Sequence, residues 1–162
     1  MSAAEIRPLA ESDREWVRQW IAEEFGDETV VSRGKLYRPE ELAGLVAERH
    51  GQPVGLLTYR LEGDACEVIS LQSRVKRQGI GSALMRAVIE MALKAGIGRV
   101  WLITTNDNTP ALRFYESREF RVVAVHKGAV DAARRLKPAI PLTGVDGVEI
   151  HDEIELEIYI SP

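Results

Sequence analysis

The stretch SRVKRQGIGSALM, residues 73–85, places two glycines one residue apart, Gly79 and Gly81, where a helical pattern begins. The apolar residues of that pattern recur every three or four positions: Ile80, Leu84, Ala87, Val88 and Met91. This spacing predicts a helix over residues 81–94 with one buried stripe, which Gly96 and Gly98 end. Apolar runs at 66–71 and 99–105 flank it. Strand, helix and strand in this order predict a right-handed crossover joining two parallel strands.

The segments around this unit predict the rest of the sheet. Strand-like runs at 42–48, 54–61 and 66–71 are separated by the turn signals HGQP and EGD, so they are expected to be antiparallel neighbours. Further strands are predicted near residue 5, at 121–126 and at 154–160. Residues 27–42 are predicted to be irregular, with one helical turn. The fold class is therefore α+β: a mixed, mostly antiparallel sheet flanked by helices, with one parallel step.

Three further helical segments are predicted. Ser12 or Asp13 would cap the first, which ends at Gly26 and carries an apolar face of Trp16, Val17, Trp20, Ile21 and Phe25. Thr109 or Asn108 would cap a short second one, with Pro110 at its first position. A helical turn is expected at 131–136 inside a long, mixed connection.

Composition limits the possible functions. The 162 residues suffice for one domain, and the net charge of −4 argues against a broad nucleic-acid or membrane footprint. The single cysteine, Cys66, cannot form an internal disulfide and is expected to be a small buried residue. No apolar run is long enough to span a bilayer, and the first residues lack a signal-peptide pattern. We expect a cytoplasmic protein that is a monomer or a homodimer and binds neither nucleic acid nor membrane.

The loop before the central helix is suited to an anion. The first N–H groups of a helix lack intrahelical partners and carry the positive end of its dipole, which favours phosphate. The glycines allow a ligand to approach the backbone, and Lys76 and Arg77 add positive charge. A Walker loop is excluded because no Lys-Ser or Lys-Thr follows Gly81, and a Rossmann fingerprint because Leu84 stands where its third glycine belongs.

Two motifs together resemble the GNAT N-acetyltransferase superfamily. Its signature, Arg/Gln-x-x-Gly-x-Gly/Ala, corresponds to KRQGIG at residues 76–81. A second family pattern corresponds to Asn108, Ala111, Phe114, Tyr115 and Phe120. The order of elements is similar over nearly the whole chain, which is expected to form a single acetyltransferase domain, residues 1–162. Two departures are that Lys76 replaces the forked first residue and that Glu119 replaces a glycine that usually has positive φ.

The resemblance implies acetyl-coenzyme A as cosubstrate, without a metal. It implies that the pantetheine lies between splayed strands and pairs with the main chain of Leu71 and Ser73, with the Leu71 N–H facing the thioester carbonyl. It also implies a set of residues along the coenzyme, with backbone N–H groups on the pyrophosphate: Lys76, Arg77, Gln78, Gly79, Ile80, Gly81, Ser82, Asn108 and Phe114.

The implied chemistry is direct acetyl transfer to the primary amine of a small molecule or protein. The amine must lose a proton and the leaving thiolate must gain one or accept a hydrogen bond. Tyr115 matches the family's tyrosine and is the predicted acid. Glu67 stands where some protein-acetylating members place a glutamate and is the predicted base. Acceptor specificity is expected from residues 25–37 and 128–148, and the acidic balance favours a cationic acceptor.

Other readings stay open at this stage. An acyl-CoA-binding regulatory or accessory domain without turnover, or a structural protein that keeps only the fold, would share these motifs. The run HDEIELE is not expected to bind metal, because strand alternation separates its side chains onto two faces. The run ARRLKP is predicted to be a solvated basic turn, in which Arg134 or Arg135 could meet an acidic acceptor.

Overall fold

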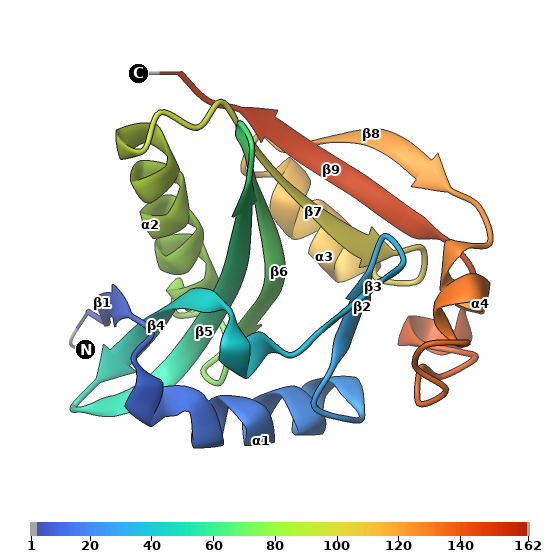
Figure 1. Ribbon diagram of the computed structural model, residues 1–162, viewed down its shortest axis with the longest axis horizontal. Helices are drawn as coiled ribbons and strands as arrows, with labels where there is room; N and C mark the ends of the chain where they lie inside the picture. Colours follow the sequence, from blue (N-terminus) through green and yellow to red (C-terminus); the bar gives the residue numbers. More distant parts are fainter. Residues whose placement is uncertain (1–2, 162) are drawn as a thin grey trace.

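The computed structural model, which describes residues 3–161, contains a seven-stranded sheet of order β1-β4-β5-β6-β7-β9-β8 (Figure 1). Its strands are β1 (Glu5–Pro8), β4 (Ala43–Arg49), β5 (Gln52–Glu62), β6 (Ala65–Ser73), β7 (Arg99–Thr105), β8 (Arg121–His126) and β9 (Glu153–Tyr159). Neighbours are antiparallel except β6 and β7, which are parallel and joined through a helix. The predicted α+β fold with one parallel step is confirmed.

Helices cover both faces of this sheet (Figure 1). The helices are α1 (Arg14–Phe25), α2 (Ile80–Lys94), α3 (Thr109–Glu116) and α4 (Ala129–Ala133). On one face α2 forms the main core with the sheet, and Leu112 and Tyr115 of α3 pack against that core. On the other face, Val17 and Ile21 of α1 pack against Leu56 of β5. The helical turn predicted at residues 131–136 corresponds to α4, which begins and ends earlier in the chain than predicted.

Residues 27–42, predicted to be irregular, contain a β-hairpin. Strands β2 (Val30–Ser32) and β3 (Lys35–Tyr37) pair antiparallel, and a short 3₁₀ turn, η2 (Pro39–Glu41), supplies the expected helical turn. The hairpin turn consists of Arg33 and Gly34, with φ of 48° and 76°. A two-residue turn with both φ values positive is a favoured hairpin connection. The prediction was wrong because Arg is seldom the first residue of such a turn and the strands are very short.

The ends of the helices agree in part with the predicted caps. The Asn108 side chain accepts a hydrogen bond from the Ala111 N–H at 3.3 Å, as a cap of α3. Asp13 stands at the N-cap position of α1, but its side chain makes no capping bond to that helix. Its carboxylate instead binds the Arg7 guanidinium at 2.7 Å and the Ala10 N–H at 2.7 Å, which ties α1 to β1. The predicted capping role of Asp13 was wrong, because Arg7 offers a charged partner.

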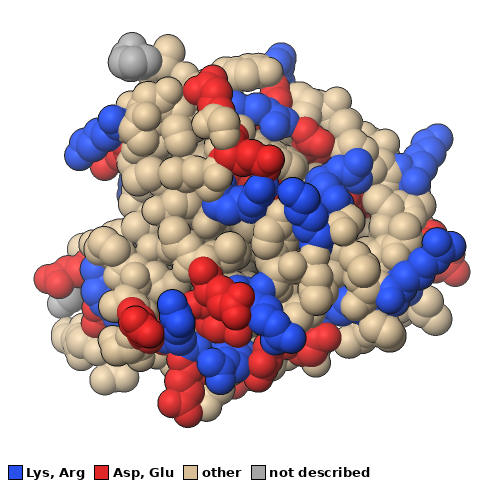
Figure 2. All heavy atoms as spheres, in the orientation of Figure 1, with Lys and Arg blue, Asp and Glu red and all other residues tan. Residues whose placement is uncertain are grey.

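Two surface properties bear on function. Basic and acidic side chains are interspersed on the face shown in Figure 2 and do not form one broad patch of a single sign. Within residues 3–161, no helix combines the length and the apolar character that crossing a membrane requires. Cys66 is fully buried, as expected, and burial raises the pKa of its thiol to about 12.

We expect Asp13→Asn to destabilise the fold by about 2 kcal/mol at pH 7, since it removes a buried charged acceptor. The Arg7 hydrogen bond holds the pKa of Asp13 well below its usual range. The carboxylate therefore contributes stability above the unfolded-state pKa of about 3.9, and this contribution is lost as the pH falls below it. In urea unfolding experiments, the free energies of unfolding of wild type and Asp13→Asn should converge as the pH is lowered. Glu11→Gln, an exposed neighbour with the same charge change, should cost less than about 0.5 kcal/mol; an equal loss in both variants would contradict this account.

Candidate active site

The site begins where the parallel strands separate. Pairing between β6 and β7 runs from Ala65–Arg99 to Val68–Leu102 and extends no further within residues 3–161, although both strands continue. The pairing of β6 with β5 shifts register at the same level, because Thr58 pairs with Ser70 and Tyr59 with Val68. This leaves Ile69 as a bulge residue, and a bulge bends its strand. Figure 1 shows the two ribbons diverging at this open end. Residues of the open end line two cavities.

The first cavity, of about 600 Å³, lies between the end of β6, the start of α2 and α3. It brings together most of the residues predicted to hold a cofactor: Leu71, Ser73, Lys76, Arg77, Gly79, Ile80, Gly81, Ser82 and Phe114. Two predicted residues lie elsewhere. The exposed Gln78 side chain accepts a hydrogen bond from Arg49, and Asn108 lines the second cavity.

The start of α2 presents free N–H groups to this cavity. Gly79 adopts φ of +73° at the N-cap, a left-handed conformation that costs glycine little. The first N–H of the helix with a backbone partner is that of Ala83, which donates to the Gly79 carbonyl at 3.0 Å. The N–H groups before it are therefore available to an anion, as the sequence predicts.

The two motifs that are distant in sequence meet at this helix start. A Cβ added to Gly81 would lie 3.2 Å from the Phe114 ring, so the glycine lets α2 approach α3 closely. The Phe114 and Tyr115 rings pack edge to face with centroids 5.3 Å apart, and Phe120 packs on Tyr115 at 5.8 Å. At this corner Glu119, which stands in place of the family's usual glycine, adopts φ of +71°, a conformation that is uncommon for a residue other than glycine.

The second cavity, of about 720 Å³, lies at the open end of β6 and β7. Its walls come from the two segments expected to set specificity. These are the end of α1 with β2, and the connection from α4 to β9; they contribute Phe25, Gly26, Val30, Val31, Val130, Ala133, Lys137, Ala139, Ile140, Pro141, Gly144 and Val145. Both cavities are lined by Leu71, Ala111 and Tyr115, so they adjoin at these three residues.

Tyr115, the predicted acid, therefore stands between the two cavities. Its ring packs on the main core while the residue remains partly exposed. Burial raises the pKa of the phenol to about 12. The hydroxyl is thus protonated throughout the ordinary pH range and is available as a hydrogen-bond donor.

Glu67, the predicted base, lines neither cavity. Its side chain is buried under the β2–β3 hairpin, where the Ser32 hydroxyl donates to it at 2.6 Å and Arg60 lies 3.9 Å away. Burial is the main cause that raises the pKa of this carboxyl. A different carboxylate, Glu153 at the start of β9, lines the second cavity and binds Arg33 at 3.0 Å. Glu153 was not predicted from the sequence. The signal for it was the alternation in HDEIELE, which places Glu153 on the sheet face opposite to that of the core side chains of the same strand.

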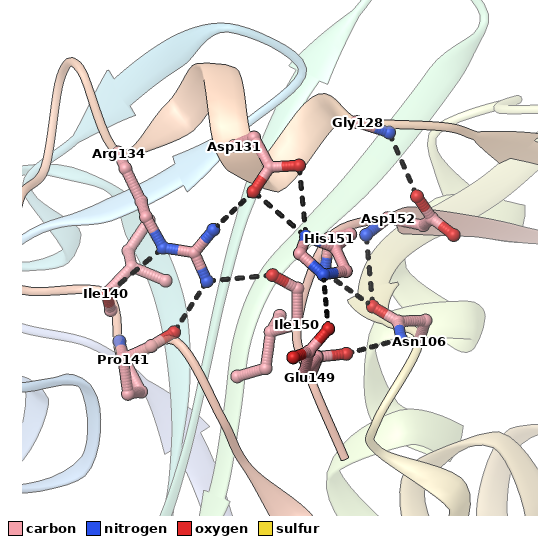
Figure 3. A network of polar contacts seen from close by, with 10 residues as sticks. All are labelled: Asn106, Gly128, Asp131, Arg134, Ile140, Pro141, Glu149, Ile150, His151 and Asp152. Carbon is pink, nitrogen blue, oxygen red and sulfur yellow. Dashed lines mark hydrogen bonds and ion pairs between the residues drawn. The ribbon is translucent and has the colours of Figure 1, made fainter.

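Two of the three charged residues of ARRLKP, Arg134 and Lys137, are not solvated, whereas Arg135 is exposed as predicted. The Arg134 guanidinium binds Asp131 at 2.7 Å and the carbonyls of Pro141 and Ile150 at 2.7 and 2.8 Å (Figure 3). The Lys137 ammonium lies 3.3 Å from Asp27, and its side chain is almost fully buried. Arg134 and Lys137 therefore bind polar groups of the irregular segments around the second cavity. The prediction was wrong for these two, because their partners are remote in sequence.

A polar network holds the connection between α4 and β9 against the end of β7 (Figure 3). The Asn106 side chain accepts from the N–H groups of His151 and Asp152 at 2.9 and 3.0 Å and donates to the Glu149 carbonyl at 2.8 Å. The His151 ring lies between the carboxylates of Asp131 and Glu149, whose hydrogen bonds raise its pKa. Within residues 3–161, no group of three or more His, Cys, Asp or Glu side chains has the arrangement of a metal site.

Comparison with known proteins agrees with this geometry. Residues 6–120 match the model of a family described as acetyltransferase (GNAT) family. The chain belongs to the GNAT family. The uncharacterized protein YdhI of Bacillus subtilis is 39% identical over 150 residues, which cover 92% of this chain and 94% of that protein.

Solved structures of acetyltransferases share the fold. An acetyltransferase from Elizabethkingia anophelis, with acetyl-CoA bound, is 16% identical and superposes with a TM-score of 0.72 over 99% of this chain and 100% of that chain. An acetyltransferase from Bacillus subtilis in complex with CoA is 15% identical, with a TM-score of 0.71 over 97% and 99%. The family membership and the GNAT fold predicted from the motifs are confirmed.

We expect Gly79→Ala to weaken CoA binding, because alanine disfavours φ of +73° and the loop must readjust. Space is not limiting, since nothing lies within 4 Å of the added Cβ. Gly63→Ala is the matched control: Gly63 also has positive φ, 59°, and equally open surroundings, but it lies in the β5–β6 turn. Both variants should lose about 1 kcal/mol of stability. Calorimetric titration with CoA should show weaker binding for Gly79→Ala alone; equal affinities would refute the loop's role.

Proposed function

We propose that this GNAT chain is an acetyl-CoA-dependent N-acetyltransferase that moves the acetyl group directly onto a primary amine. The observation that carries the proposal is the junction of two cavities at Leu71, Ala111 and Tyr115. One lies beside the free N–H groups of α2, and the other is walled by the end of α1, β2 and the connection from α4 to β9. The binding of acetyl-CoA and CoA by structurally similar GNAT proteins supports this assignment of the first cavity.

The residues of the first cavity fit a coenzyme A molecule. The N–H groups at the start of α2, with Lys76 and Arg77, suit the diphosphate. The edge of β6 beyond Val68, which lacks a β7 partner in residues 3–161, suits the amide groups of pantetheine. When bound, the coenzyme supplies an acetyl thioester, whose carbonyl oxygen would be stabilised by the Leu71 N–H as charge develops.

The transfer itself balances as follows. The amine nitrogen forms a bond to the acetyl carbon, the carbon–sulfur bond breaks, the amine loses a proton and the thiolate gains one. The products are an amide and CoA with a free thiol. Tyr115 is our proposed donor to the sulfur, because it faces both cavities and its raised pKa keeps it protonated.

The proposed acceptor is a cationic amine. Asp107 is buried on the wall of the second cavity, and its carboxylate accepts hydrogen bonds from neutral donors, the Thr105 hydroxyl and the Val145 N–H. Within residues 3–161 it makes no ion pair, so its charge remains available to a cation. The cationic groups near this cavity are engaged, Lys137 with Asp27 and Arg33 with Glu153.

An amine with a pKa near 10.4 must lose its proton first, which costs about 4 to 5 kcal/mol at pH 7. Glu67 remains our predicted base; since it lines neither cavity, it could take up the proton of the amine only through intervening water. Glu153 is a second carboxylate on the acceptor side. The predicted cytoplasmic location is part of the proposal, since the buried free thiol of Cys66 is compatible with a reducing compartment.

The proposal is tested with purified protein, acetyl-CoA and a panel of polyamines, amino acids, aminoglycosides and peptides, with release of free CoA as the readout. Acetyl-CoA at 100 times its Kd should stabilise the fold by about 2.7 kcal/mol, which raises Tm by several degrees. We expect turnover with cationic amines. Stabilisation without turnover on any amine would favour the accessory-domain alternative, and a flat melting curve at millimolar acetyl-CoA would refute CoA binding altogether.

We expect Tyr115→Phe to lower kcat by about 100-fold while the Kd for CoA stays unchanged, because it removes only the hydroxyl donor. Tyr59→Phe is a suitable control, since Tyr59 packs on the same core and lines neither cavity. Steady-state kinetics with the best acceptor would check this. If kcat of Tyr115→Phe equals that of wild type, the hydroxyl does not assist the leaving thiolate.

A further inference from the structure

One guanidinium in the first cavity plays no part in the motifs. Arg118 follows α3 and lines the cavity together with Lys76 and Arg77. Its Nε donates to the Ser82 hydroxyl at 3.0 Å, and Ser82 belongs to the first turn of α2. The guanidinium therefore reaches from the α3 side to the helix end where the free N–H groups lie.

The surroundings hold this guanidinium in place without neutralising it. Its centre lies 3.7 Å from the centroid of the Phe114 ring, and it donates to the Phe114 carbonyl at 3.0 Å and to the Ser117 hydroxyl at 2.8 Å. All of these partners are neutral, and Arg118 forms no ion pair with any carboxylate in residues 3–161. The Nη2 group also donates to the Ser82 hydroxyl, which leaves one Nη2 N–H of the guanidinium without a partner in residues 3–161. A fixed, positively charged group of this kind on a cavity wall is suited to a phosphate oxygen, because the charge strengthens the hydrogen bond.

We propose that Arg118 binds the diphosphate of coenzyme A opposite the N–H groups of α2. This inference rests on the proposed function of the first cavity. It also accounts for Lys76, which replaces the forked residue of the family signature with a point charge. In this chain a guanidinium is supplied 42 positions further on by Arg118, which lines the same cavity.

The contacts of Arg118 would also allow a structural role, in which it only joins α3 to α2. Three ligands separate the two roles: CoA, dephospho-CoA, which keeps the diphosphate but lacks the 3′-phosphate, and S-acetylpantetheine, which has neither. Arg118→Met keeps an apolar side chain over Phe114 and removes the charge. Arg113→Met is the matched control, because Arg113 is exposed on the neighbouring helix α3 and lines neither cavity.

Calorimetric titration should show Arg118→Met binding CoA and dephospho-CoA about tenfold or more weakly than wild type, with S-acetylpantetheine unaffected. Arg113→Met should bind all three like wild type. Unchanged CoA affinity in Arg118→Met, or a loss on CoA that dephospho-CoA does not share, would overturn the proposal. An equal loss on S-acetylpantetheine would assign Arg118 to structure instead.

Arg118→Lys provides an independent test if Arg118→Met folds poorly. It keeps a positive charge on the cavity wall but removes the planar guanidinium that bonds Ser82 and stacks on Phe114. Diphosphate binding by Arg118 predicts that Arg118→Lys binds CoA and dephospho-CoA more tightly than Arg118→Met does, whereas a purely structural bridge predicts an equal loss in both variants. If wild type itself fails to bind CoA, the proposed function falls together with this inference.

Discussion

The site depends on the point at which β6 and β7 stop pairing, after Val68 and Leu102. Up to there the strands form an ordinary parallel pair. Beyond it, the bulge at Ile69 bends β6, and the backbone that would have paired is left facing a cleft. Unpaired backbone groups that are shielded from water need partners. The open end of β6 and β7 is therefore suited to a ligand that forms hydrogen bonds with the backbone as a neighbouring strand would.

The two sides of that opening are built by different means. The side that we propose for the coenzyme uses backbone N–H groups at a helix end and close contact between α2 and α3, which glycine and an aromatic ring can provide. The side that we propose for the acceptor uses segments far apart in the chain, held by single polar contacts such as Lys137 with Asp27 and Asn106 with His151. Tyr115 belongs to both sides.

This division also explains what could be predicted from the sequence. Strands, the α2 helix and the coenzyme loop follow from local rules of periodicity and helix ends, so their placement by motif agreed with the structure. The β2–β3 hairpin could not be recognised, because two strands of three residues carry too few side chains for a pattern. Arg134, Lys137 and Glu153 were misjudged or missed for another reason, since their partners lie remote in the chain and only the tertiary fold brings them together.

The central claim is that the two cavities adjoining at Tyr115 are the donor and acceptor halves of one site. The most direct measurement is a crystal structure with a conjugate that joins CoA through its sulfur to a cationic amine. We predict the diphosphate on the N–H groups at the start of α2, the sulfur beside Tyr115 and the amine portion in the second cavity near Asp107. A conjugate whose amine portion points away from the second cavity, or whose CoA portion lies outside the first, would contradict the account.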